Sequence, residues 1–156
     1  MQSCFIGHRT IERTEELALK LRETVLTLII NGVNTFVFGS KSQFNDLSWE
    51  IVKELKKDFP FIKRVYCRSA FQYISKEYEK YLLQWYEETY FLPKLEKAGK
   101  YSYVERNYVM IDKSSYCIFY YNEKYALAKR SSGTKIAYEY AKRKKKQIIN
   151  LYKQYT

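Results

Sequence analysis

Apolar positions along the chain recur at helical spacing in five segments. The clearest begins at Thr14, a suitable N-cap, and ends at Asn31-Gly32, a suitable helix end, with an apolar residue at every fourth position from Leu17 to Ile29. Together, the spacing and the helix-breaking residues predict helices over 14–31, 42–60, 75–91, 103–114 and 134–144.

Five short runs between these helices are apolar throughout instead of alternating with polar residues. They predict strands at 2–6, 35–38, 62–67, 116–121 and 147–152. Strands that are buried on both faces and alternate with helices are typical of a parallel sheet with helices on both sides. The pattern therefore predicts an α/β fold, a single Rossmann-like domain over 1–156 with right-handed crossovers.

The segment at about 70–100 is an insertion into this alternation and is rich in aromatic residues. Its predicted helix, 75–91, places Tyr78, Tyr81 and Trp85 on a broad stripe. Such a stripe favours burial in the core or in a dimer interface, and a base-stacking surface is the alternative, since stacking needs such rings beside cations. Pro93 is expected to end the helix, and a loop is expected at 97–100.

Charge adds a second possible partner. Lysine and arginine outnumber aspartate and glutamate by 28 to 17, which gives a formal net charge of +11. This excess fits nucleic acid or another polyanion, but it also fits a lysine-rich solvated surface. The densest run, 142–146, falls at the end of a predicted helix, where cations favour the macrodipole, so the solvated surface is the preferred interpretation.

The remaining composition points to a cytoplasmic protein. No apolar run approaches the roughly 20 residues of a membrane helix, and the N-terminus lacks a signal-peptide pattern. Cys4, Cys67 and Cys117 lie far apart in apolar runs, as is typical of reduced, buried thiols. No cysteine or histidine has metal-ligand spacing, so neither a metal nor a cofactor is expected.

Small and polar residues follow three of the predicted strands. Gly7-His8-Arg9 follows the first strand, Gly39-Ser40 the second, and Ser132-Gly133-Thr134 opens the last helix. In this architecture ligands bind beyond the carboxyl ends of the strands, where glycine admits a ligand close to the backbone and helix N-termini favour negative charge. The three turns together predict a site for an anionic, phosphate-bearing ligand, and without a GxGxxG or Walker motif they do not indicate a standard NAD or ATP site.

Arg106 and Asn107 lie in the short predicted helix before the strand at 116–121. The arginine suits a phosphate, and the asparagine suits a ribose or a base. A surface pair of Arg106 with Glu105 or Asp112 is the equally supported alternative. His8 likewise suits either a ligand contact or a packing role.

With these residues in view, the chain resembles the SLOG superfamily, and most closely its small bacterial members of the YpsA type. The similar segments are "FIGHR" at 5–9, "FGSKSQFNDLSWEIV" at 38–52, "ERNYVMIDKSSYCIFYY" at 105–121 and "SGTKIAYEYAKRKKKQIINL" at 132–151. The resemblance covers nearly the whole chain and implies a Rossmann-like sheet that binds nucleotides or nucleotide-derived ligands, often as a homo-oligomer. The superfamily also includes the Lonely guy enzymes and DNA-processing proteins that bind single strands.

Two departures leave enzyme status uncertain. The second turn, "FGSKSQFND", lacks the superfamily's usual run of glycine and alanine. The carboxylate of the Lonely guy motif falls on Ala137, and Glu139 lies about 200° away around the helix. Glycosidic cleavage needs an acid or a base beside the leaving group, for which Glu105 and Asp46 are the candidates.

Three functions follow in order of preference. The first is the sensory or regulatory binding of a nucleotide or nucleotide-derived ligand. The second is hydrolysis of a nucleotide N-glycosidic bond, in the manner of a phosphoribohydrolase. The third is binding of single-stranded nucleic acid, while no membrane partner is expected.

Overall fold

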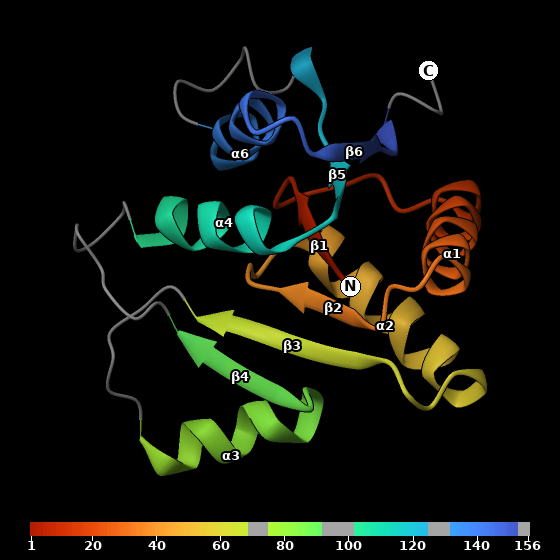
Figure 1. The fold of residues 1–156 in the computed structure, drawn as a ribbon. Coiled ribbons are helices and arrows are strands. Elements are labelled where there is room, and N and C mark those ends of the chain that lie inside the picture. The colour runs from red at the N-terminus through yellow and green to blue at the C-terminus, as the bar shows by residue number, and fades with distance from the viewer. Residues whose placement is uncertain (69–74, 92–101, 125–131, 153–156) are drawn as a thin grey trace.

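The fold is a six-stranded, all-parallel sheet with helices on both faces (Figure 1). The computed structural model describes residues 1–68, 75–91, 102–124 and 132–152. Within these ranges the strand order is β4-β3-β2-β1-β5-β6. The strands are β1 (Gln2–Gly7), β2 (Thr35–Phe38), β3 (Lys63–Arg68), β4 (Glu88–Phe91), β5 (Tyr116–Tyr120) and β6 (Gln147–Asn150).

Two apolar cores lie on opposite faces of the sheet. One joins inward residues of the strands, such as Phe5 and Phe36, to α1 and α2, and the other joins Ile6 and Val37 to α4 and α6. Successive residues of a strand point to opposite faces, so the continuous apolar runs fill both cores. The helices are α1 (Glu15–Ile30), α2 (Gln43–Asp58), α3 (Lys76–Trp85), α4 (Ser102–Lys113) and α6 (Gly133–Arg143). The predicted α/β architecture is confirmed.

Polar caps explain where the helices begin. The side chains of Thr14, Ser42 and Ser132 each accept a hydrogen bond from a backbone N–H in the first turn of the following helix. At the end of α1, Gly32 has φ of +104°, a conformation that residues with a side chain rarely adopt. The predicted boundaries of α1 and α2 are therefore correct to within one or two residues.

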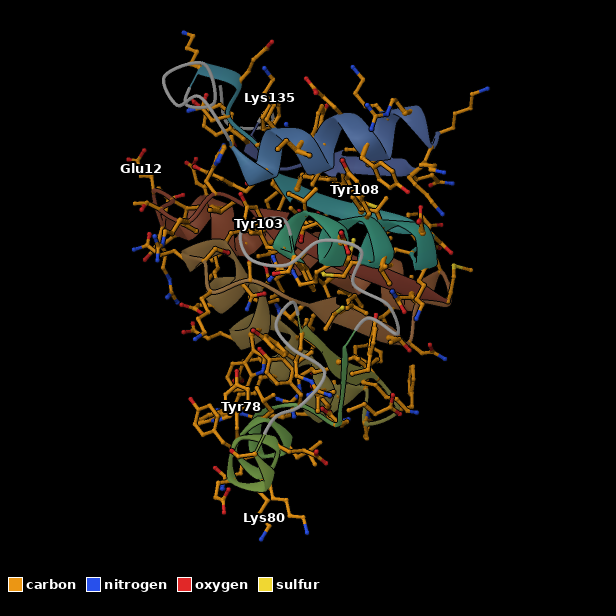
Figure 2. All side chains as sticks on the ribbon, turned by 90° about the vertical axis from the view of Figure 1, so that its left-hand side faces the viewer. Glu12, Tyr78, Lys80, Tyr103, Tyr108 and Lys135 are labelled. Carbon is orange, nitrogen blue, oxygen red and sulfur yellow. The ribbon has the colours of Figure 1, made fainter. Side chains whose placement is uncertain are left out.

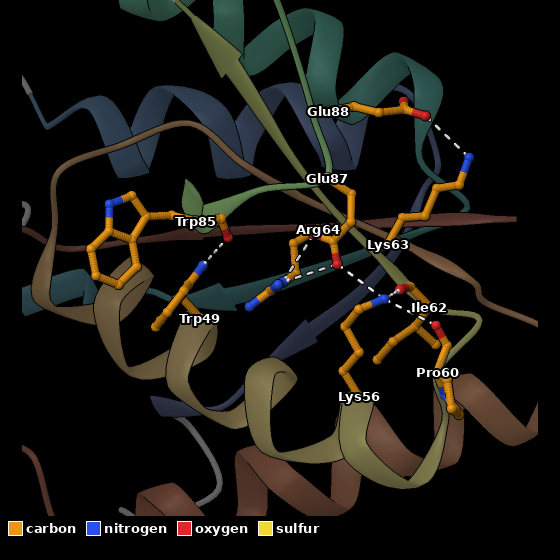
Figure 3. Close-up of polar contacts among 9 residues, drawn as sticks. All are labelled: Trp49, Lys56, Pro60, Ile62, Lys63, Arg64, Trp85, Glu87 and Glu88. Atoms are coloured by element: carbon orange, nitrogen blue, oxygen red, sulfur yellow. Dashed lines mark hydrogen bonds and ion pairs between the residues drawn. The ribbon is translucent and has the colours of Figure 1, made fainter. Parts of the chain in front are cut away.

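The predicted helix at 75–91 is wrong in its second half. It ends at Trp85, and Glu88–Phe91 instead forms β4, the edge strand that pairs with β3. Cross-strand contacts explain the difference: Glu87 binds Arg64, and Glu88 binds Lys63 at 3.1 Å, both on the β3 side (Figure 3). Pro93 and the loop predicted at 97–100 lie outside the described residues.

The aromatic face of α3 does not form part of the core. Leu82 is the one buried residue of this helix, while Tyr81 and Trp85 are 55% and 41% exposed. The interpretation of the stripe as core is wrong here. Cys4, Cys67 and Cys117, by contrast, are buried and unbridged, as expected. No helix among the described residues is long and apolar enough to span a bilayer.

Candidate functional site

A cavity of about 440 Å³ opens at the carboxyl ends of the central strands. β1 lies between β2 and β5, and the chain leaves β1 and β5 toward opposite faces, which makes this the switch point of the sheet. Figure 2 views this edge, with Tyr103 of α4 near its centre. We call the cavity the switch-point pocket; its polar and glycine lining is Gly7, Arg9, Ser40, Lys41, Ser42, Tyr103, Arg106, Asn107, Gly133 and Thr134.

Arg106 is the most unusual residue of the switch-point pocket. It is only 7% exposed, and its guanidinium donates to Asn107 Oδ1 at 3.2 and 3.3 Å. Burial lowers the pKa of this guanidinium, a sign that its charge is poorly solvated. In the part of the chain that the structure describes, no carboxylate lies within 4 Å of it. A buried cation without a counter-ion is costly, and a bound anion would offset that cost.

The alternative that Arg106 forms a surface ion pair is therefore wrong. Asp112, one of its proposed partners, accepts hydrogen bonds from the Tyr140 hydroxyl at 2.8 and 2.9 Å. Arg106 instead reaches over the end of β2, where a Cβ on Gly39 would lie 2.9 Å from its Cδ and 2.6 Å from Met110 Sδ. Gly39 lies behind the pocket and does not line it; its role is to let α4 approach the sheet.

Two helices begin at the switch-point pocket. α2 starts after its cap, Ser42, whose hydroxyl lies 3.0 Å from that of Ser40, and α6 starts at Gly133. The first N–H groups of a helix have no partner within the helix, and the macrodipole adds positive potential there. With Arg9 and Lys41 exposed at the rim, positive charge reaches the cavity from several elements.

Gly7 and the turn after it tie β1 to α2. A Cβ on Gly7 would lie 2.4 Å from the ring of Phe44, which is fully buried. Beyond it, the Arg9 carbonyl accepts from the Gln43 N–H at 2.9 Å, and the Gln43 side chain accepts from the Ile11 N–H. Gly7, which the sequence predicts to admit a ligand, is thus also required by the packing of Phe44 against β1.

His8 and Ser132 do not line the pocket. His8 is 3% exposed, and its Nε2 accepts a hydrogen bond from the Asn122 N–H at 2.8 Å. Its ring lies against Tyr120 and Tyr121. Of the two roles left open by the sequence, the structure gives His8 the packing role. Ser132 caps α6 through the Lys135 N–H.

The candidate carboxylates lie elsewhere. No aspartate or glutamate is among the described residues that line the switch-point pocket, and neither Glu105 nor Glu139 is one of them. Ala137, at the position of the Lonely guy carboxylate, is buried against the sheet. Asp46 lines a neighbouring cavity, where burial and the charge of Glu50 raise its pKa, against an opposing effect of Arg13. The described residues also contain no cluster of metal ligands.

The neighbouring cavity is walled by aromatic rings. This aromatic pocket, of about 530 Å³, shares Ser40 and Lys41 with the switch-point pocket. Tyr78, which Figure 2 shows on α3, belongs to it. The other aromatic residues of the lining are Trp49, Tyr66, Tyr81, Trp85 and Tyr86, and its polar residues include Asn45, Asp46 and Glu50.

A basic groove continues from the aromatic pocket along α2. The two share Trp49 and Trp85, whose rings meet edge to face at 5.4 Å and whose chains are joined by a hydrogen bond from Trp49 Nε1 to the Trp85 carbonyl (Figure 3). The groove adds four cations, Lys53, Lys56, Lys57 and Arg64. Lys56 and Arg64 are paired with Glu87, whereas Lys53 lies over the Trp49 ring.

Sequence reasoning missed Lys41, Ser42 and Tyr103. Lys41 had a local signal, since it stands between the predicted strand end at Gly39-Ser40 and the start of the next helix. Tyr103 had none, because nothing in the local sequence distinguishes it from Tyr108 of the same helix. Seven of the ten predicted residues do meet at the pocket: Gly7, Arg9, Ser40, Arg106, Asn107, Gly133 and Thr134.

Comparison with known proteins establishes the fold. No family model matches the chain, and no curated protein matches it. Among solved structures, DNA processing protein A from Helicobacter pylori superposes with a TM-score of 0.60 at 16% identity, over 95% of this chain and 63% of that one. That protein is described for its single-stranded DNA binding mode. The chain shares the fold of the matched region and spans less than two thirds of that protein's length.

Proposed function

We propose that the protein binds a nucleotide or nucleotide-derived ligand at the carboxyl edge of its sheet, as a sensory or regulatory protein. The ligand's phosphate would occupy the switch-point pocket. The observation that carries this proposal is Arg106, a buried guanidinium at the pocket with no carboxylate partner among the described residues. Its burial costs free energy in the absence of an anion, which suits a residue kept for binding.

The rest of the pocket supports a phosphate in particular. Arg9 and Lys41 add two exposed cations, and the N-termini of α2 and α6 supply N–H donors and positive potential. Gly133 and Thr134 open α6 at the pocket, as in helices that bind phosphate through their first turn. Because no described lining residue is acidic, no carboxylate competes for these donors.

The resemblance to small SLOG proteins of the YpsA type supports the same conclusion. The SLOG-type fold agrees with it, and the superfamily implies nucleotide-derived ligands and homo-oligomers in the bacterial cytoplasm. Gly7, Arg9, Gly133 and Thr134 fall within the similar segments and line the pocket, and Gly39, Ser132 and His8 support it from behind.

Thermal unfolding with a ligand panel tests the proposal. The panel contains inorganic phosphate, AMP, cyclic nucleotides, ADP-ribose and NAD, with adenosine as the control that lacks phosphate. A ligand at about 100 times its Kd should stabilise the fold by about 2.7 kcal/mol, and AMP should stabilise it more than adenosine. The proposal is wrong if no phosphate-bearing member of the panel raises the melting temperature at millimolar concentration.

Arg106→Met separates binding from folding. The substitution keeps an unbranched apolar side chain in place of the arginine stem but removes the buried charge, so the ligand-free protein should be as stable as wild type or more stable. Phosphate-bearing ligands should bind about tenfold more weakly or worse, a loss of about 1.4 kcal/mol. Arg22→Ala, which removes an exposed cation of α1 outside the pocket, is the matched control. A destabilised Arg106→Met protein with unchanged affinity would make Arg106 structural.

Single-stranded nucleic acid is a second candidate, and the basic groove favours it. Four cations and two tryptophans lie together there, which is the combination that single strands require. The structural neighbour's binding of single-stranded DNA adds weak support.

A further inference from the structure

We propose that the aromatic pocket holds the base of the same nucleotide whose phosphate occupies the switch-point pocket, and that it prefers a base with an exocyclic amino group. This inference rests on the proposed function and specifies its ligand. Three observations carry it: the continuity of the two cavities, the distribution of their charges, and a buried acceptor on Asn45.

The two cavities join at the turn after β2. Ser40 and Lys41 line both of them, so a ligand that passes this turn contacts both pockets. Each cavity has a volume within the range of small-molecule sites, at about 440 and 530 Å³. One ligand with a charged end and a flat apolar end would therefore fill the pair.

Charge sets the direction of the ligand. The switch-point pocket has Arg9, Lys41 and Arg106 and no described carboxylate, whereas the aromatic pocket carries Asp46 and Glu50. A phosphate is attracted to the first cavity and repelled from the second. The neutral base is then the part of the nucleotide that enters the aromatic pocket.

The rings of the aromatic pocket suit a flat heterocycle. Tyr78 and Tyr81 are stacked at 6.3 Å between centroids, and Tyr66 and Tyr86 lie 5.1 Å apart. Tyr81 and Trp85 remain 55% and 41% exposed, so large apolar area is left uncovered on this side of α3. Stacking of a base on such rings is favourable for any base, and it supplies affinity without selectivity.

Asn45 supplies the selectivity. It lines the aromatic pocket, is 4% exposed, and its Oδ1 has no hydrogen-bond partner among the described residues. The Asn45 side chain hydrogen-bonds to Tyr86, where it partly offsets the rise in pKa that burial causes in the Tyr86 hydroxyl. The unpaired oxygen calls for a donor from the ligand, since a buried acceptor without a donor is costly. An exocyclic amino group donates to this oxygen, whereas a carbonyl at the same place would be repelled.

Isothermal titration with ribose 5-phosphate, AMP and IMP tests the inference. The three ligands share the phosphate and ribose, and IMP replaces the amino group of AMP with a carbonyl. AMP should bind about tenfold more tightly than ribose 5-phosphate, and IMP should be several-fold weaker than AMP. Asn45→Leu should abolish the protein's preference for AMP over IMP. Trp85→Ala should weaken the binding of AMP and leave the binding of ribose 5-phosphate unchanged.

Leu83→Ala is the matched control, because Leu83 is an exposed residue of α3 that lines neither cavity. If Asn45→Leu fails to fold, the ratio of the Kd values of wild type for AMP and IMP and the affinities of the Trp85→Ala variant still test the inference. The inference is overturned if AMP and ribose 5-phosphate bind equally and both depend on Arg106, an outcome that leaves the proposed function standing. Absence of binding by all three ligands would also overturn the inference, and it would overturn the proposed function only together with a negative result for the whole ligand panel.

Discussion

His8 links the turn after β1 to the end of β5 at the carboxyl edge of the sheet. The imidazole Nε2 accepts a hydrogen bond from the Asn122 N–H just after β5, and the backbone N–H of His8 donates to the Tyr120 carbonyl at 3.3 Å. The Nε2 bond requires that this nitrogen carry no proton, because a protonated imidazole has only donors. A side chain whose nitrogen is used in this way, at 3% exposure, positions the turn after β1 and does not line the switch-point pocket.

His8→Phe tests this packing role. Phenylalanine keeps a ring against Tyr121 but leaves the Asn122 N–H without its acceptor. The free energy of unfolding should fall by about 1–3 kcal/mol, while the Kd for AMP on the folded protein stays near that of wild type. Urea denaturation and titration measure the two quantities. Unchanged stability with a tenfold weaker Kd would instead make His8 a ligand residue.

At the residue scale, the sequence predicted seven residues that line the switch-point pocket but not how they pack there. Arg106 and Asn107 were identified by residue type, but whether the arginine is buried depends on Gly39 and Met110, which come from other elements. Tyr103 joins the pocket through tertiary packing as well, whereas Lys41, next to Ser40 in the turn after β2, could have been found from its position in the sequence. Residue type and local spacing indicate a phosphate ligand, whereas tertiary packing decides which residues line the pocket.

Elements pack closely where β1 ends against the first turn of α2. The Phe44 ring occupies the space that a side chain on Gly7 would need, with 2.4 Å between the added Cβ and the ring. Gly7→Ala should therefore lower the free energy of unfolding by about 1–3 kcal/mol through overpacking. Adding Phe44→Leu should recover part of that loss, so that the double variant is more stable than the sum of the single effects predicts.

Gly133→Ala provides the comparison, because its Cβ would lie 3.3 Å from Tyr103, a half-buried residue that can shift. Urea denaturation of the four variants measures the coupling. Strict additivity of Gly7→Ala and Phe44→Leu would show that the glycine is not required by this contact.

β4 is the element that sequence periodicity could not find. Apolar and aromatic residues continue at helical spacing through Tyr86 and Tyr90, so the pattern predicts one long helix. The strand depends on partners more than twenty residues away, since Glu87 and Glu88 pair with Arg64 and Lys63. The other five strands were found because each contains a short apolar run between helical segments, which is a local signal.

Glu87 gives this edge of the molecule a dependence on pH. Burial acts to raise the pKa of its carboxyl, but the hydrogen bonds and charges of Arg64 and Lys56 outweigh burial and lower it (Figure 3). Since the folded pKa lies below the unfolded value of about 4.3, ionised Glu87 stabilises the fold above that pH. This contribution is lost as the pH falls through the folded pKa.

Glu87→Gln should therefore reduce stability at pH 7 and make the remaining stability less sensitive to pH between about 5 and 3. Glu54→Gln is the control, because Glu54 forms an exposed pair with Lys57 at 3.1 Å. Urea unfolding at pH 7, 5 and 3 gives the comparison. Parallel curves for wild type and Glu87→Gln would show that this carboxyl does not control the acid sensitivity.

On the scale of the whole molecule, two regions contribute to the net charge of +11 in different structural settings. The densest run, 142–146, ends α6, where Lys146 donates to the Asp112 carbonyl and Arg143 and Lys144 lie near the Tyr140 ring. These contacts and the helix C-terminus account for that run as a solvated face. The basic groove differs, because its cations lie beside Trp49 and Trp85, the two residues that it shares with the aromatic pocket.

The salt dependence of binding to a labelled oligothymidylate distinguishes a general attraction to the positive surface from binding in the basic groove. If the basic groove holds a single strand, affinity measured by fluorescence anisotropy should fall steeply with salt, with a log–log slope of about −0.7 per phosphate contacted. The double variant Lys53→Gln with Lys57→Gln should then reduce the magnitude of the slope by about 1.4. The control is Lys142→Gln with Lys145→Gln, which removes the same charge from α6 and the turn after it. This control should change the slope little. Equal effects of the two pairs would mean that the strand responds to net charge alone. No binding at about 50 mM salt would remove nucleic acid as a candidate, because electrostatic attraction at that salt is at its most favourable.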